Sequence, residues 1–215
     1  MNKKQKTIKK LESIAEKIRL NFSAKDTARE KALRLSREII RHSANTIRAA
    51  HRREYDEAKR LLKSAASSAQ ELNREIEDSQ SEMVYSGFIH DAQKEFAEAS
   101  ITLSLINSEP IPDPEKLNVS YPAYLNGMGE ATGELRRYIL DSLRRNDFSR
   151  CEELLSTMDE IYAMLVTMDF PDAITYGLRR TTDTVRGILE KTRGDLTMAL
   201  RQKELEEKLG SITKK

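Results

Sequence analysis

Apolar residues recur at helical spacing along nearly the whole chain, and no stretch alternates with the period of two that a half-buried strand requires. The clearest apolar stripe, within residues 81–107, consists of Ala92, Phe96, Ala99, Leu103 and Ile106. Only eight glycines and five prolines occur in 215 residues, too few for the many turns of a β-rich fold. The pattern therefore predicts an all-α protein.

The same spacing predicts about seven helices in a single antiparallel bundle that forms one domain over residues 1–215. Ser23, followed by Asp26, resembles a capping signal that separates a first helix from a second. The expected helices cover about 5–21, 23–52, 54–77, 81–107 and 121–145, a sixth after the turn at Asn146, and a last one opened by Pro171. Four prolines mark a linker at about 108–122, and the tail is expected to fray from about residue 205.

Bulk charge and cysteine content exclude several classes of protein. The formal net charge is only +2, so a nucleic-acid surface would have to come from local patterning. A single cysteine, Cys151, excludes an internal disulfide framework and a multi-cysteine metal site. The charged N-terminus and the lack of a long apolar run predict a cytoplasmic protein without membrane contact.

Acidic residues lie at helical-face spacing on two of the expected helices. Asp91, Glu95 and Glu98 stand at i, i+4 and i+7, and Glu130 and Glu134 are i, i+4 partners. If the two helices face each other, their oxygen ligands converge on a site suited to Mg²⁺ or Mn²⁺. The alternative is a solvated acidic face, which is the usual role of such pairs on spacing alone.

Three glycines, Gly127, Gly129 and Gly133, fall on the helix that carries the second acidic pair. Each costs about 1 kcal/mol relative to alanine in a helix interior. Their concentration indicates close approach, by a metal or phosphate ligand or by a neighbouring helix alone. The sequence leaves these two explanations open.

Two motifs resemble those of the translin and Trax family, most closely its Trax branch: YLNGMGEATGELRR at 124–137 and KEFAEA at 94–99. The order and length of the helices and the proline-bearing linker are also similar. The resemblance implies a divalent-metal-dependent endoribonuclease that cleaves single-stranded RNA. Its metal ligands and catalytic groups would be Glu95, Glu98, Glu130 and Glu134, with Asp91 as an optional outer ligand. Glu130 departs from the pattern, because Trax chains have an aspartate there.

The resemblance further implies assembly into roughly octameric shells around RNA, with or without a translin-like partner subunit. For RNA contact the sequence offers Arg137 and an arginine stripe at Arg34, Arg37, Arg41, Arg48 and Arg52. A solvated face with local acidic partners is an equal interpretation of that stripe. The histidines, His42, His51 and His90, lack ligand spacing and are expected at the surface.

Two other functions compete with the nuclease. A translin-type protein would bind single-stranded RNA or DNA without cutting it, and the acids would then serve assembly only. A helical scaffold would self-associate and show no salt-sensitive nucleic-acid binding. Both acidic motifs are filled, which a pure binder does not need, and the arginine stripe disfavours the scaffold.

Overall fold

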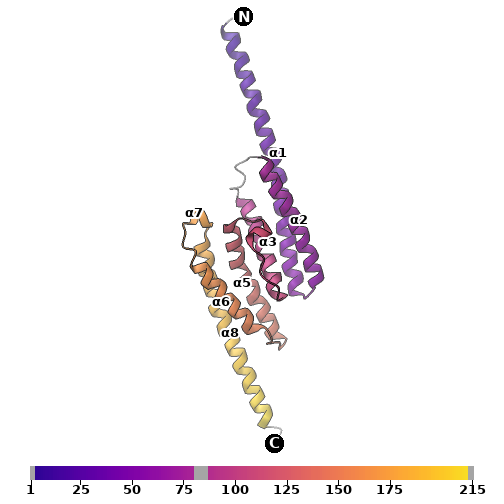
Figure 1. Cartoon of the computed structure of the whole chain (residues 1–215), viewed down its shortest axis with the longest axis vertical. Coiled ribbons are helices and arrows are strands. Elements are labelled where there is room, and N and C mark those ends of the chain that lie inside the picture. Colours follow the sequence, from indigo (N-terminus) through magenta and orange to yellow (C-terminus); the bar gives the residue numbers. More distant parts are fainter. Residues whose placement is uncertain (1–2, 80–86, 213–215) are drawn as a thin grey trace.

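The computed structural model describes residues 3–79 and 87–212, and within these ranges the chain is helical with no strand (Figure 1). The helices are α1 (Lys3–His51), α2 (Tyr55–Ser79), α3 (Gly87–Ile106), α4 (Pro114–Leu117), α5 (Tyr121–Arg144), α6 (Cys151–Val166), α7 (Asp172–Thr175) and α8 (Leu178–Ile212). The all-α prediction is confirmed. No helix in the described ranges is long and apolar enough to cross a membrane.

The six long helices form a bundle in which α3 and α5 lie at the centre. Helix α1 packs on α2 and α3, α3 packs on α5, and α5 packs on α6 and α8. The core between them is built from aliphatic residues such as Leu35, Ile39, Ile101, Leu135 and Met158, all almost fully buried. This arrangement places the two helices that carry the acidic motifs side by side.

The predicted break between the first two helices is wrong, because α1 is continuous from Lys3 to His51. The hydroxyl of Thr27 donates to the Ser23 carbonyl one turn earlier, so this segment keeps helical geometry. No glycine or proline lies between Lys3 and His51, so neither helix breaker interrupts this segment. A cap-like pattern alone does not end a helix when the residues on both sides of the pattern favour helix.

The C-terminal part also differs from the expectation. Pro171 opens only the single turn α7, because Tyr176 and Gly177 both adopt positive φ and α8 begins afterwards at Leu178. Helix α8 then continues to Ile212, through the tail that was expected to fray. The proline linker contains the short helix α4, opened by Pro114 in its first turn.

Candidate metal centre

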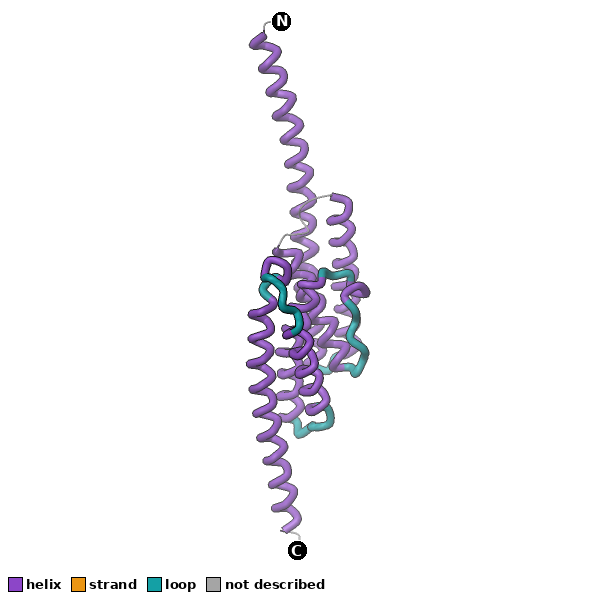
Figure 2. The backbone as a smooth tube through the Cα atoms, turned by 60° about the vertical axis from the view of Figure 1, so that its left-hand side comes forward, coloured by secondary structure: helices purple, strands orange, loops and turns teal. Residues whose placement is uncertain are grey.

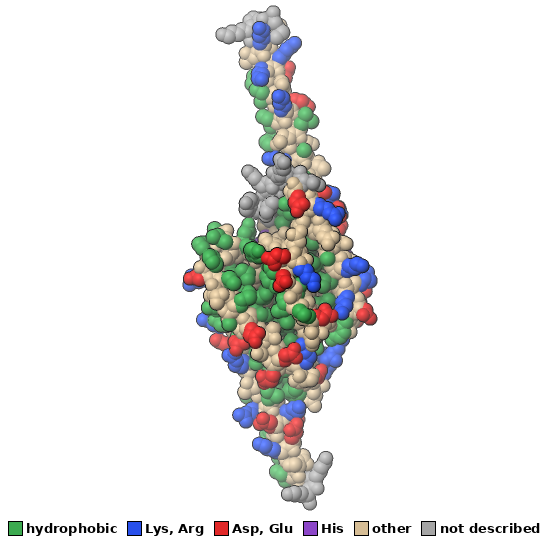
Figure 3. Space-filling view, in the orientation of Figure 1, with side chains coloured by type: hydrophobic (Ala, Val, Ile, Leu, Met, Phe, Trp, Pro, Cys, Tyr) green, Lys and Arg blue, Asp and Glu red, His purple; other side chains and the backbone are tan. Residues whose placement is uncertain are grey.

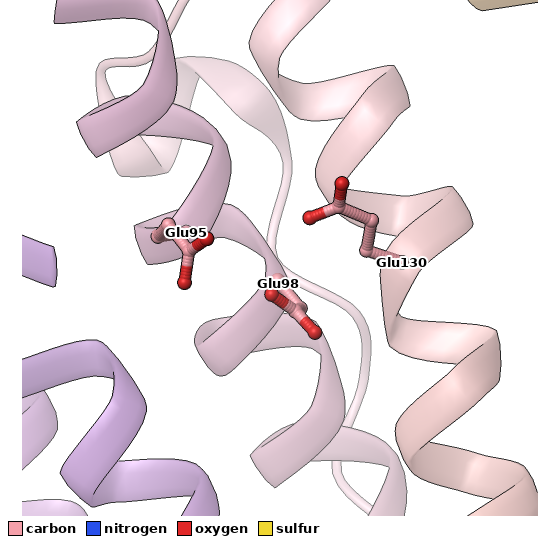
Figure 4. A group of neighbouring side chains, drawn as sticks. All are labelled: Glu95, Glu98 and Glu130. Atoms are coloured by element: carbon pink, nitrogen blue, oxygen red, sulfur yellow. The ribbon is translucent and has the colours of Figure 1, made fainter. Parts of the chain in front are cut away.

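Three carboxylates converge between α3 and α5. Glu95 and Glu98 extend from α3 and Glu130 reaches toward them from α5 (Figure 4). One oxygen from each lies within 4.8 Å of the others, a separation that a single cation can bridge. An all-oxygen set of this kind suits a hard divalent ion such as Mg²⁺ or Mn²⁺. The donor chemistry therefore fits the expected metal.

Close packing of the two helix backbones brings the acids together. A Cβ atom added at Gly127 would lie 2.5 Å from the Lys94 carbonyl oxygen and 3.0 Å from the Glu98 nitrogen. Helix α5 therefore approaches the backbone of α3 at the turn that carries Glu95 and Glu98. At Gly129 the space is taken by the Thr181 side chain of α8. Gly127 and Gly129 therefore serve helix packing, whereas a Cβ at Gly133 would meet only Ile188 at 3.8 Å.

Glu98 is the electrostatic centre of the cluster. Its side chain is buried, with the residue only 8% exposed. Burial, and then the charges of Glu130, Glu95 and Glu134, raise its pKa to about 8. Burial also raises the pKa of Glu95, although the charge of Lys94 acts in the opposite direction. A site that raises two carboxyl pKa values in this way is short of positive charge.

The other two acids have internal partners. Lys94 Nζ lies 2.7 Å from Glu130 Oε1, and the His51 ring nitrogen Nε2 donates to Glu134 Oε2. The hydrogen bond from His51 is the main reason why the pKa of Glu134 is lowered. Glu134 is not one of the three clustered acids, yet its charge acts on both Glu95 and Glu98. It lies at the side of the site, held by α1.

The raised pKa of Glu98 predicts how pH affects the stability of the metal-free chain. Because the folded-state pKa lies above the unfolded value, the contribution of Glu98 is fully present below about pH 4.5. It is lost as pH rises through about 8. Glu98→Gln lacks this titration. We expect its melting temperature to match that of the wild type near pH 4.5 and to exceed it by about 5 °C at pH 9. Thermal melts in EDTA across this range would measure the difference, and a constant offset would contradict the assignment.

The carboxylates line a cavity of about 500 Å³ whose far wall is the first part of α8. That wall is formed by Arg180, Thr181, Thr184, Val185 and Ile188. Arg180 is exposed and, within the described part of the chain, forms no ion pair with the acids. The sequence gives no signal for Arg180, because its position opposite the acids depends on how α8 packs on α5. A free guanidinium here can bind an anion that enters the cavity.

All five residues of the predicted arginine stripe are exposed, four on α1 and Arg52 in the turn directly after it. Three of these arginines donate hydrogen bonds to side chains that are close to them in the sequence. Arg34 pairs with Glu38 at 2.9 Å, Arg48 donates to Asn45, and Arg52 forms two hydrogen bonds with Glu54. These contacts favour the interpretation as a solvated face for Arg34, Arg48 and Arg52, and Arg37 and Arg41 share the same exposed surface.

The remaining predicted residues fall into different places. Arg137 is exposed and lies 3.9 Å from Glu134, at the edge of the site. Its neighbour Arg136 instead ties α5 to α8 through Thr192 and Asp195. Asp91 is exposed one turn before Glu95 and lies outside the three-carboxylate cluster.

The expectation that the histidines lie at the surface is wrong for His51, and His42 and His90 are half-buried. The His51 side chain is only 3% exposed, and its Nδ1 is buried without a hydrogen-bond partner among the described residues. Nδ1 of His42 is buried in the same way, and His90 stacks on Tyr176 with ring centroids 4.3 Å apart. Histidine spacing along the sequence gave no signal, because the acid that His51 contacts is 83 residues away.

Comparisons with known proteins show the family and the fold of the chain. The model of the Translin family matches residues 1–193. An uncharacterized protein of Methanocaldococcus jannaschii is 32% identical over 196 residues, which cover 90% of this chain and 86% of that protein.

Solved structures are similar as well. The structure of an AfC3PO–duplex RNA complex has a TM-score of 0.81 at 32% identity, covering 87% of this chain and 97% of that one. The crystal structure of AfC3PO gives 0.79 at 33% identity with the same coverage. Apo-NeC3PO, at 20% identity and a TM-score of 0.72 over 88% of this chain and 96% of that one, shows a likeness of fold.

Proposed function

The chain belongs to the translin family, and from this premise we propose that it is a Trax-like endoribonuclease that cleaves single-stranded RNA with Mg²⁺ or Mn²⁺. The observation that carries the proposal is the convergence of Glu95, Glu98 and Glu130 around a buried carboxyl group. A non-catalytic binder gains nothing from a buried acid whose pKa is raised to about 8. A cation site explains why the chain keeps a buried carboxyl group that is unfavourable to ionise.

In this proposal Glu95, Glu98 and Glu130 hold the cation, and Glu134 supplies a fourth carboxylate from the side. When bound, the ion would lower the pKa of a water molecule and stabilise charge on the scissile phosphate. Glu98 has to release its proton before it can act as a ligand. His51 fixes one oxygen of Glu134 and so limits how far that side chain can turn into the site.

Two further groups act on the substrate rather than on the cation. Arg180 faces the acids across the cavity and can bind a phosphate of the RNA backbone. Lys94 is now paired with Glu130, and its ammonium group would be released to bind a phosphate once a cation occupies that carboxylate. Glu130, which stands where Trax chains have an aspartate, is longer by one methylene group and still reaches the cluster from α5.

The direct test is an incubation of the purified chain with an end-labelled single-stranded RNA in Mn²⁺, in Mg²⁺ and in EDTA. We expect cleavage in both metals and none in EDTA. Glu134→Ala should lose cleavage and keep RNA binding. A duplex of the same sequence, included because a similar structure contains duplex RNA, tests the preference for single strands. Binding without cleavage in every condition would refute the nuclease proposal for the chain alone.

One observation favours the competing function, a binder of single-stranded RNA or DNA that does not cut. Lys94 and His51 already partner two of the four acids, so part of the negative charge is balanced without a cation. In that case nucleic acid would bind equally in EDTA and remain intact.

The proposed enzyme assembles from copies of this chain, up to an octamer. Activity that appears only after a translin-like chain is added would instead assign the chain as one subunit of a mixed assembly.

Arg180 provides a prediction about RNA binding. If its guanidinium binds a backbone phosphate, Arg180→Gln should weaken binding about tenfold at low salt and reduce the slope of log affinity against log salt by about one. Arg179→Gln is the matched control, because its neighbouring exposed side chain lines a different cavity beside α7. Fluorescence anisotropy over a salt series measures both quantities. Equal losses in the two variants would mean that the effect is general charge and not a specific contact.

A further inference from the structure

The first part of α1 stands alone outside the bundle. Helix α2 runs back along α1 past Lys31, which pairs with Glu75, and ends one turn later at Ser79. Residues 4–26 therefore extend beyond the bundle as a single helix, about 35 Å long at 1.5 Å per residue (Figures 1 and 2). We call this segment the N-terminal arm.

The arm carries an unpartnered apolar stripe, visible as hydrophobic side chains along the projecting helix (Figure 3). The residues of the stripe, at alternating spacings of three and four, are Ile8, Leu11, Ala15, Ile18 and Phe22. Leu11 is 60% exposed and Phe22 is 65% exposed. Alternation of three and four is the heptad pattern of helices that pack in a coiled coil. Further along α1, Ala32, Leu35 and Ile39 are buried within the bundle.

A helix of this length gains most of its stability from packing its apolar face, and among residues 3–79 and 87–212 nothing covers that face. We propose that the N-terminal arm pairs with the N-terminal arm of a second copy of this chain in an antiparallel two-helix coil. This surface is separate from the carboxylate site, and the proposal does not depend on the nuclease function.

The charge pattern selects the antiparallel orientation. The first ten residues hold several lysines, including Lys4, Lys6, Lys9 and Lys10, and no acid. A parallel pair would place these two lysine clusters side by side, where like charges repel. An antiparallel pair places them at opposite ends, separated by roughly the length of the arm. Charge repulsion therefore opposes the parallel arrangement only.

The heptad register then defines the facing residues. In an antiparallel coil the first apolar position of each heptad faces the second one of the other helix. Leu11 accordingly faces Phe22 of the second copy, and Ala15 faces Ile18 of the second copy. In this register Glu12, beside the stripe, lies within one turn of Arg19 of the second copy, and the pair repeats by symmetry. The same register places Ile8 opposite Lys25 of the second copy, so the central apolar contact consists of Leu11, Ala15, Ile18 and Phe22.

Cysteine cross-linking of the full-length chain, without RNA, tests the orientation directly. Leu11→Cys and Phe22→Cys are made separately, each with the buried Cys151 replaced by alanine, and are mixed in equal amounts under mild oxidation. The antiparallel coil predicts mainly the mixed disulfide between the two variants, identified by its intact mass, because only that pair comes within disulfide reach. Mainly homodisulfides would indicate a parallel coil and would overturn the proposal, as would the absence of any cross-link.

A second set of variants tests the apolar stripe. Ile18→Gln in both cysteine backgrounds should reduce the yield of the mixed disulfide at least about tenfold at a fixed protein concentration. Leu20→Gln is the matched control, since Leu20 is 64% exposed on the opposite side of the arm and should leave the yield unchanged. Equal effects of the two variants would overturn the proposal. So would binding of the arm to anionic lipid vesicles without cross-linking, which would identify a membrane surface as the occupant.

Discussion

Glu98→Gln is expected to abolish metal-dependent RNA cleavage, with a loss of at least about 1,000-fold in rate. Glu98 is the buried member of the three-carboxylate cluster, and glutamine keeps its shape while removing the charge that a cation requires. Single-turnover cleavage in saturating Mn²⁺ measures the rate, and calorimetric titration with Mn²⁺ measures binding of the ion. We expect both to fail together, because the residue acts through the cation.

The expected stability of Glu98→Gln distinguishes a loss of catalysis from unfolding. Glutamine removes a carboxyl group whose burial is unfavourable once ionised, so the metal-free variant should be at least as stable as the wild type above pH 5. Loss of activity combined with a higher melting temperature is the signature of an acid kept for function. Glu160→Gln, an exposed acid on α6, is the control and should change neither property. Retained cleavage in Glu98→Gln would show that the cluster is not the catalytic site.

Much of the fold and the acidic pairs could be predicted from the sequence because both depend on local periodicity. The helix expected over about 121–145 and the turn at Asn146 follow from spacing and from turn residues, and the structure has them as α5 (Tyr121–Arg144) and the turn after it. The single helix α1 was misread because Ser23 and Asp26 form a cap-like pattern within an otherwise uninterrupted helical sequence.

The partners of the acids could not be predicted in this way. His51 is the last residue of α1 and Arg180 lies near the start of α8. Each therefore reaches the site only through the packing of the bundle. Lys94 was visible in the motif, but its choice of Glu130 depends on the distance between α3 and α5. Sequence periodicity indicates on which face of its helix a residue lies. Tertiary packing decides which residues of the other helices it contacts.

Gly127→Ala is expected to be strongly destabilising because it would force α3 and α5 apart. The new methyl group would lie 2.5 Å from the Lys94 carbonyl oxygen and 3.0 Å from both the Ala97 Cβ and the Glu98 nitrogen. Backbone atoms on α3 cannot move aside as the end of a flexible side chain can. Overpacking of this kind costs about 1–3 kcal/mol, only partly offset by the better helix propensity of alanine.

Gly133→Ala is the matched control, because it lies on the same helix and changes the same atom. Its added Cβ would meet Ile188 at 3.8 Å, an ordinary contact, so the helix propensity of alanine should stabilise the chain by up to about 1 kcal/mol. We expect the two variants to shift the melting temperature in opposite directions, by about 5 °C downward for Gly127→Ala and by a smaller amount upward for Gly133→Ala. The displaced α5 of Gly127→Ala should also separate Glu130 from Glu98 and weaken Mn²⁺ binding. A Gly127→Ala variant with unchanged stability and unchanged Mn²⁺ affinity would show that close packing of α3 and α5 does not set the geometry of the site.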